Sequence, residues 1–169
     1  MVERLLPRVR TLVHYLAAGD RDADDLVQLS LVQLLRSAGA FRGDSRLEAW
    51  ADRITIRTSL RYLKRRRWRE QRVCLEPHDE PAGAAGQLSA AERQQLRPHL
   101  LGLLQRLAPE QRVTVVLRLM HQYSLEEIAA VTGAPVNTVR DRLQVGRRKL
   151  RRLLVRDPVL RDWVRRRQS

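Results

Sequence analysis

The stretch FRGDSRLEAWADRITIRTSLRYLKRRRWR, residues 41–69, decides how the rest of the chain can be arranged. Its first four residues are a turn signal, and Ser45 stands three residues before Glu48, the reciprocal capping pair that marks the start of a helix. Neither Pro nor Gly follows, so the stretch predicts a single helix of about 24 residues, roughly 36 Å long.

Three faces are predicted for this helix at ~100° per residue. Two are apolar, one with Leu47, Trp50, Ala51, Ile54, Thr58 and Tyr62, the other with Ile56, Leu60 and Leu63. Between them runs a basic stripe, with Trp50 near its start and Trp68 near its end, made of Arg46, Arg53, Arg57, Arg61 and Lys64. Guanidinium groups suit phosphate oxygens and flat rings suit unstacked bases, so the stripe is a candidate platform for single-stranded nucleic acid. The alternative is a solvated basic face on a core helix.

The composition favours an all-α protein with an anionic polymer as its partner. No window of the 169 residues alternates apolar and polar residues as a strand does. The net charge is +14 and the pI is near 11.5, which points to nucleic acid. No apolar run approaches the ~20 residues of a membrane-spanning helix, so we expect a cytoplasmic protein. A single cysteine, Cys74, and four scattered histidines predict no disulfide, no metal site and no cofactor.

Two helices are expected before this stretch. The first runs from Val2 to about Leu16; the second is capped by Asp22, carries Asp24 and Asp25 in its first turn, and ends near Gly39. Leucine and valine circle the second helix almost completely, so it is either a core element or has a face reserved for another protein, and its periodicity favours the core. Neighbouring carboxylates on a helix point about 100° apart, so we expect no catalytic role for the acid pair.

A change of composition after Arg72 divides the chain. Residues 76–86 are rich in Pro, Gly and acid and hold almost no large apolar side chain, which is typical of a linker. We therefore expect two small helical domains joined by a flexible linker, with the boundaries 1–72, 73–88 and 89–155, and a basic tail at 156–169. The tail either extends the last helix along a phosphate backbone or is a solvated end.

The second domain contains a helix-turn-helix pattern. Ser89 with Glu92 is a capping pair, and Pro98 and Pro109 are each expected to begin a helix. A second capping box begins at Ser124, a turn follows at 132–134, and a longer helix runs from Pro135 to Leu150. Its inward seam is Val136, Val139, Leu143, Gly146 and Leu150. The outward residues suit major-groove reading, because Arg pairs with guanine and Asn or Gln with adenine; they are Asn137, Asp141, Gln144, Val145 and Arg148, flanked by Thr138, Arg140, Arg142 and Arg147. An ordinary helical hairpin is the alternative.

These stretches together resemble a bacterial RNA polymerase sigma factor of the extracytoplasmic-function type. Residues 22–28 resemble the family's polymerase-binding helix, and Phe41 to Ser45 with Trp50 and Ile54 resemble its promoter-melting segment. The stretch from Leu107 to Leu143 resembles its helix-turn-helix. The resemblance covers nearly the whole chain, in the family's order and spacing.

The resemblance implies roles for three sets of residues. Binding to the beta-prime clamp helices of core polymerase would fall to Asp24, Asp25 and Gln28. The minus-ten element, where a base is flipped and the duplex opens, would be held by Arg42, Ser45, Arg46, Trp50, Arg53, Arg57, Arg61, Lys64 and Trp68. The minus-thirty-five element would be read by Asn137, Thr138, Arg140, Asp141, Arg142, Gln144, Arg147 and Arg148. It also implies the beta flap of the polymerase and an anti-sigma factor, frequently at the membrane, as partners, and no small-molecule substrate.

Several residues depart from the family's usual pattern. Arg57 stands where Asn is common and Arg61 where Asp is frequent, which favours backbone affinity and alters base choice. Asn137 replaces a common Gly, a mild change because Asn tolerates unusual backbone angles. Asp141 replaces a Ser and Val145 an Arg on the reading face, so an uncommon minus-thirty-five sequence, or weak dependence on one, is expected.

The hypothesis from the sequence is a promoter-specificity subunit that catalyses no reaction itself. A stand-alone helix-turn-helix regulator would explain the second half and leave the first without a role. An enzyme that processes nucleic acid would need carboxylates placed around a metal or as an acid and base, and the acids here lie at helix starts or in the linker.

Overall fold

The computed structural model describes residues 2–19, 21–70 and 90–168, and within these ranges every regular element is a helix. The expected all-α fold is therefore confirmed. The expected linker at 73–88 and Ser89 of the first capping pair lie outside the described residues. The elements are α1 (Val2–Ala17), α2 (Ala23–Ser37), the 3₁₀ turn η1 (Ala38–Ala40), α3 (Leu47–Glu70), α4 (Ala90–Gln105), α5 (Pro109–Met120), α6 (Leu125–Thr132), α7 (Val136–Arg156) and α8 (Pro158–Gln168).

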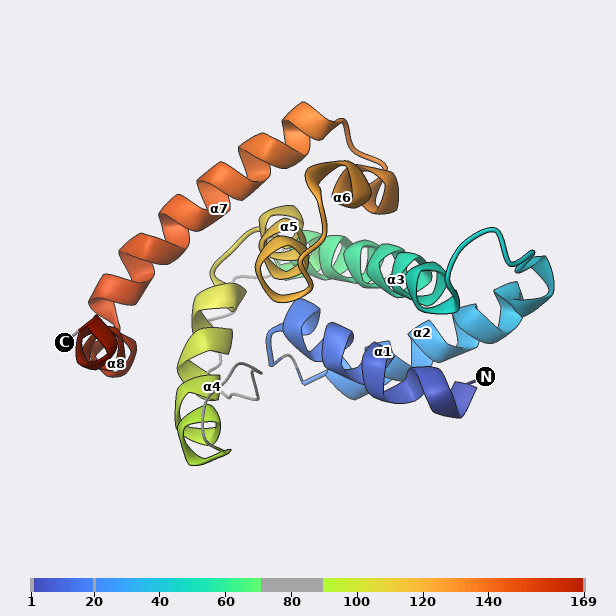
Figure 1. The fold of residues 1–169 in the computed structure, drawn as a ribbon. Helices are drawn as coiled ribbons and strands as arrows, with labels where there is room; N and C mark the ends of the chain where they lie inside the picture. The colour runs from blue at the N-terminus through green and yellow to red at the C-terminus, as the bar shows by residue number, and fades with distance from the viewer. Residues whose placement is uncertain (1, 20, 71–89, 169) are drawn as a thin grey trace.

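The first half is a three-helix unit in which α1 and α2 pack against α3 (Figure 1). Leu5 and Val9 of α1 meet Leu26 and Leu34 of α2 in one buried cluster, and Ala51 of α3 completes it. Half-buried residues of α3 pack on the same cluster, namely Leu47, Trp50, Ile54 and Tyr62. The first apolar face predicted for α3 is therefore the face that builds this unit.

The second apolar face of α3 packs against the second half of the chain. Ile56 and Leu60 share a cluster with Leu101 and Leu104 of α4 and with buried residues of α5. The same cluster includes Leu12 and Leu16 of α1. The two halves therefore bury apolar surface against each other, a contact that the sequence pattern did not predict.

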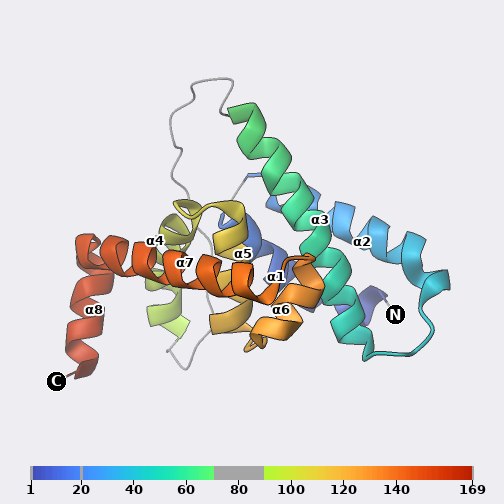
Figure 2. The same ribbon diagram turned by 90° about the horizontal axis from the view of Figure 1, so that it is seen from above.

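The helix-turn-helix, which consists of α6 and α7, packs against α5 (Figures 1 and 2). The long helix α7 crosses α5 and then projects beyond it, while α6 sits beside α3. A Cβ atom on Gly146 would lie 2.8 Å from Cγ2 of Val115, so the absent side chain lets α7 approach α5 closely. Buried Val139 and Gly146, with half-buried Leu143 and Leu150, form the predicted inward seam.

Three local expectations differ from the structure. Helix α4 begins at Ala90 and continues through Pro98, because buried Leu96 and Leu101 on either side of the proline hold the helix together. The cap of α3 is Arg46, whose carbonyl accepts from the Trp50 N–H at 3.1 Å, and the Glu48 carboxylate accepts from Arg4 at 2.5 Å. The basic tail neither extends α7 nor ends freely in solvent: the helix stops at Arg156, and α8 turns away from it.

Candidate nucleic-acid interface

The basic stripe of α3 faces outward as predicted. The side chains of Arg53, Arg57, Arg61 and Lys64 are exposed along the helix, and Arg42 and Arg46 are exposed in the segment that precedes it. That segment turns at Gly43, whose positive φ of 79° suits glycine. Ser45 is half-buried in the same segment. The six predicted minus-ten cations are therefore all exposed, along α3 and in the segment before it.

The two tryptophans of this surface lie in different environments. Trp50 packs on the core of the first half, and its ring lies 5.1 Å from that of Phe41, centroid to centroid, at a tilt of 51°. Trp68 is 58% exposed near the end of α3. Only Trp68 therefore presents most of its ring to solvent.

Two cations of the stripe contact the second half of the chain. Arg57 donates from Nε to the carbonyl oxygen of Val131 at 3.1 Å and from Nη2 to that of Ala130 at 3.4 Å. These carbonyls lie in the last turn of α6, where the helix dipole favours a cation. One helical turn beyond Arg61, Lys64 lies 3.1 Å from the carboxylate of Glu110 in α5. Part of the predicted DNA-binding stripe is therefore engaged within the protein.

A buried carboxylate joins the halves beside this stripe. Asp52 is 2% exposed and accepts from Nε and Nη2 of Arg8 at 2.7 and 2.6 Å. Its second oxygen also accepts from the Tyr123 hydroxyl in the loop before α6. Burial and this hydrogen bond raise the pKa of Tyr123, and the hydrogen bond to Asp52 raises the pKa of Arg8. No motif singles out Asp52, because its partners are 44 and 71 residues away.

Arg112 forms a second polar link between the halves. Its side chain is buried at 8% exposure, and Nη1 donates to the carbonyl oxygen of Leu16 at 3.0 Å. Nε and Nη2 donate to the carbonyls of Leu104 and Gln105 in the last turn of α4, each at 2.9 Å. The guanidinium therefore bridges the carboxyl ends of α1 and α4.

The reading face of α7 has the geometry predicted from the sequence. The Ser124 hydroxyl accepts from the Glu127 N–H at 3.0 Å, and the Glu127 carboxylate accepts from the Ser124 N–H at 2.7 Å, so the capping box is formed. Gly133, at a φ of 70°, makes the turn between the two helices. The exposed residues of α7 include Asn137, Arg140, Asp141, Gln144, Val145, Arg147 and Arg148, with Thr138 and Arg142 half-buried beside them. Arg140 donates to the Asn137 side-chain oxygen at 2.6 Å, which orients two of the donors on this face.

Helix α2 presents an outward face that the sequence pattern led us to assign mainly to the core. Asp24, Asp25 and Gln28 are exposed as predicted. Three large apolar residues are exposed beside them, namely Leu29 at 41%, Val32 at 41% and Leu35 at 55%. Their spacing puts them opposite buried Leu26, Val27 and Leu34, so a finer helical projection would have separated the two faces. The core interpretation therefore holds for one side of α2 and is wrong for the other.

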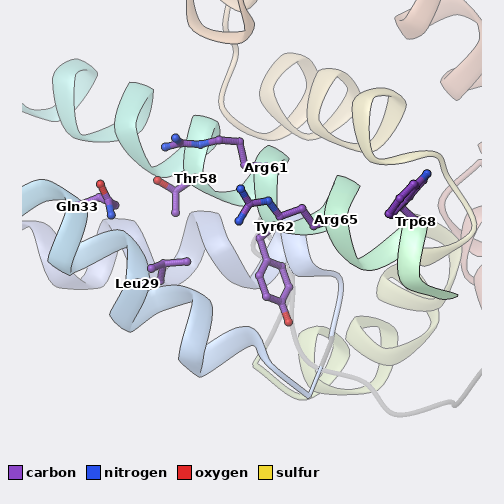
Figure 3. Close-up of a pocket in the computed structure, with 7 residues that line it drawn as sticks. All are labelled: Leu29, Gln33, Thr58, Arg61, Tyr62, Arg65 and Trp68. Atoms are coloured by element: carbon purple, nitrogen blue, oxygen red, sulfur yellow. The ribbon is translucent and has the colours of Figure 1, made fainter.

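A groove of about 560 Å³ connects this face of α2 with the C-terminal half of α3 (Figure 3). Leu29 and Gln33 of α2 form one wall. The α3 wall consists of Thr58, Arg61, Tyr62, Arg65 and Trp68. The groove thus links an apolar surface with the basic stripe.

Within the described residues, no cluster of His, Cys, Asp and Glu could hold a metal ion, and no helix is long and apolar enough to cross a membrane.

Comparison with known proteins identifies the family. The family model of sigma-70 region 2 matches residues 1–69, and that of sigma-70 region 4 matches residues 99–150. The RNA polymerase sigma factor CarQ of Myxococcus xanthus is 32% identical over 151 residues, which are 89% of this chain and 85% of CarQ. The protein belongs to the extracytoplasmic-function family of RNA polymerase sigma factors. As a sigma factor it is a promoter-recognising subunit and not a stand-alone helix-turn-helix regulator.

One further relative and two solved structures show similarity over most of the chain. The sigma-E factor of Salmonella typhimurium is 33% identical over 152 residues, covering 85% of this chain and 78% of that protein. The sigma factor RpoE of Bartonella quintana, in complex with the anti-sigma factor NepR, superimposes with a TM-score of 0.68 and 26% identity over 90% of this chain and 93% of that one. CnrH, in complex with the cytosolic domain of CnrY, gives a TM-score of 0.61 and 26% identity over 92% and 88%. These likenesses take in both halves of the chain.

Proposed function

We propose that this sigma factor docks on core RNA polymerase through the outward face of α2. Asp24, Asp25 and Gln28 supply polar contacts, and Leu29, Val32 and Leu35 supply the apolar area that a lasting contact requires. A stripe of large apolar side chains at helical spacing is typical of a protein interface, whereas scattered exposed leucines are not. The proposal rests on one observation, the exposure of these three apolar residues to solvent.

Promoter contacts are divided between the two halves. The stripe of Arg42, Arg46, Arg53, Arg57, Arg61 and Lys64 holds the phosphate backbone of the minus-ten element, with Ser45, Trp50 and Trp68 beside it. Melting costs a few kcal/mol per extruded base, and stacking on an aromatic ring returns roughly 1 to 3 kcal/mol. Trp68 is the better placed of the two rings to stack, because most of its surface is open. The outward face of α7 enters the major groove at the minus-thirty-five element.

DNA binding at minus-ten requires the two halves to separate. Arg57 gives two of its five N–H donors to carbonyl oxygens of α6, and Lys64 is paired with Glu110 of α5, so both cations lie against the second half of the chain, where DNA bound along the stripe would meet α5 and α6. We infer that docking on the polymerase holds the halves apart. An anti-sigma factor would act in the opposite direction by keeping them in a closed arrangement, a proposal supported by the similarity to the sigma factor RpoE in its complex with the anti-sigma factor NepR. The protein would act in the cytoplasm, where the polymerase works, and make or break no covalent bond.

Transcription with reconstituted polymerase tests the proposal. Core enzyme plus this protein is expected to yield specific start sites on fragmented genomic DNA, and core enzyme alone is expected to yield none of them. The double variant Arg57→Ala with Trp68→Ala is expected to reduce open-complex formation and to leave core binding intact. Failure of the wild-type protein to bind core in a pull-down would reject the proposed docking. Loss of core binding in the double variant would make α3 a docking element and would reject its assignment to DNA.

A further inference from the structure

The C-terminal arm, which we define as α7 from Arg147 onward together with α8, extends past the part of the chain that the family models match. The region 4 match ends at residue 150, and the arm continues in helix to Gln168. Figure 2 shows α8 at the edge of the molecule, running at an angle from the end of α7. The reading residues assigned above to α7 end at Arg148, so Arg147 and Arg148 belong to both the reading face and the arm.

The arm packs against α4 as an ordered part of the fold. Asp157 ends α7, and its carboxylate accepts from the Leu160 N–H at 2.9 Å, which caps the start of α8. The other carboxylate oxygen lies 2.8 Å from Nδ1 of His99 in α4. Buried Leu160 meets Leu96 and Leu103 of α4 in a separate apolar cluster, and Trp163 packs on it. The arm is therefore fixed to α4 and holds its surface residues in set positions.

Cations dominate the exposed surface of the arm. Its exposed basic residues are Arg147, Arg148, Lys149, Arg151, Arg152, Arg156, Arg161, Arg165 and Arg166. Of the two acids, Asp157 is paired with His99, and only Asp162 is exposed, 3.3 Å from Arg161. A surface of one sign on a fixed element concentrates positive potential, which attracts an anionic polymer.

The arm continues the reading face of α7. Arg148, Arg151 and Arg152 follow Gln144 on the outward side of the same helix, in successive turns. Helix α7 has 21 residues and is about 31 Å long, whereas a major groove is about 12 Å wide. When the first turns of α7 lie in the groove, the last turns have left it and lie at the level of the phosphates. We propose that the C-terminal arm binds the phosphate backbone of duplex DNA that flanks the site read by α7, without sequence preference.

The inference rests on the proposed reading of promoter DNA by α7, and the experiment distinguishes failure of the inference from failure of the proposed function. The variant Arg151→Gln, Arg152→Gln, Arg156→Gln in the full-length chain removes three exposed arm cations and no residue assigned to base reading. The control variant Arg10→Gln, Arg21→Gln, Arg106→Gln removes the same charge from exposed sites elsewhere. Holoenzyme made with each protein is titrated with two promoter fragments, one ending at the edge of the minus-thirty-five element and one extended upstream by about 15 base pairs.

Wild-type and control holoenzymes are expected to bind the extended fragment more tightly than the short one, and the arm variant to bind both equally. On the extended fragment the slope of log affinity against log salt should fall by about 2 to 3 for the arm variant, since each phosphate contact contributes about 0.9. Start-site choice should be unchanged. An unaltered slope, or the same affinity loss on both fragments, would overturn the inference. So would weaker core binding with a normal slope, because the arm would then contact the polymerase. If wild-type holoenzyme selects no promoter, the proposed function itself fails.

Discussion

The guanidinium of Arg57 caps the carboxyl end of α6 through the carbonyl oxygen of Val131, at 3.1 Å from Nε. The residues are 74 positions apart and belong to different halves of the protein. Arg57 also lies in the middle of the stripe proposed to hold minus-ten DNA. Under the proposed function this side chain has two competing sets of acceptors, the α6 carbonyls when the halves are together and DNA phosphates when they are apart.

Substituting Arg57 by Ala is expected to favour separation of the halves in the free protein. A hydrogen bond from a charged donor contributes roughly 1.5 to 3 kcal/mol when buried, and the exposure of Arg57 reduces this to about 1 kcal/mol, or a several-fold rise in the open population. Distances between spin labels at Arg36 and Lys149, in a chain with Cys74 replaced by Ser, would report the change. Arg61→Ala is the matched control, because the Arg61 guanidinium bonds to the Arg57 carbonyl of its own helix. Equal distance distributions for both variants would show that Arg57 does not hold the halves together.

Close packing of α7 on α5 predicts that Gly146→Ala destabilises the helix-turn-helix. The added methyl would lie 2.8 Å from Cγ2 of Val115, which is 2% exposed and has no room to move. Overpacking of this kind costs roughly 1 to 3 kcal/mol, against a helix-propensity gain of about 1 kcal/mol. Urea unfolding measures the difference, and the cost should vanish in a Val115→Ala background. Gly102→Ala in α4 meets nothing within 4 Å and should stabilise the protein by up to about 1 kcal/mol.

Neighbouring leucines on α2 separate a docking role from a folding role. Leu35 is 55% exposed, so Leu35→Ala should change the free energy of unfolding by less than about 1 kcal/mol and weaken core binding at least several-fold. Leu34 is 1% exposed, and Leu34→Ala should cost roughly 2 to 5 kcal/mol of stability. Calorimetry with core polymerase and urea unfolding measure the two effects. Normal core affinity in the Leu35 variant would remove α2 from the interface.

Two half-buried histidines, His14 and His121, predict that the fold loses stability in mild acid. Burial lowers the pKa of His121 and of His14 below the ordinary 6.5, so as the pH falls from 7 through 6.5 the unfolded chain binds more protons than the folded one. The free energy of unfolding should therefore fall as the pH falls through this window. The groups that act on His121 are Asp52, which opposes the shift, and Arg8, which adds to it. The pKa values of Glu110 and Asp157 are lowered, so these carboxylates stay ionised throughout the window.

Urea unfolding at several pH values measures this dependence. His121→Gln should remove part of the slope and His14→Gln a further part, because each deletes one group that must lose its proton on folding. A pH dependence identical to that of the wild type in both variants would contradict the assignment.

Sequence periodicity predicted those features that depend only on residues within one helix. The two apolar faces of α3, the length of α3, the capping box at Ser124 and the seam of α7 were all predictable, since each follows from spacing of ~3.6 residues per turn or from a local hydrogen bond. Long-range partners were not predictable in this way. The second apolar face of α3 indicated burial, but nothing in its spacing named α4 and α5 as the elements that cover it.

Polar residues at the junction were the hardest to assign. Asp52 was left out of every predicted site because a lone acid within a basic helix resembles a solvated residue, and only the fold brings Arg8 and Tyr123 to it. In the arm, the end of α7 has a local cause, because Asp157 precedes Pro158 and is extended, whereas the contact of Asp157 with His99, 58 residues earlier in the chain, is not visible in the sequence. Most candidate DNA-binding residues are exposed, whereas Ser45, Trp50, Thr138 and Arg142 are half-buried, and the engagement of Arg57 and Lys64 within the protein is apparent only from the structure.

The buried guanidinium of Arg112 places a charged group in the interface between the two halves. In the closed arrangement it donates to the carbonyls of Leu16 in one half and Leu104 in the other. When the halves part, water replaces the first of these acceptors, and hydration of the cation offsets some of the apolar surface that becomes exposed. A buried cation stabilises such an interface less than apolar residues of similar volume would, which suits a joint that the proposed function requires to open.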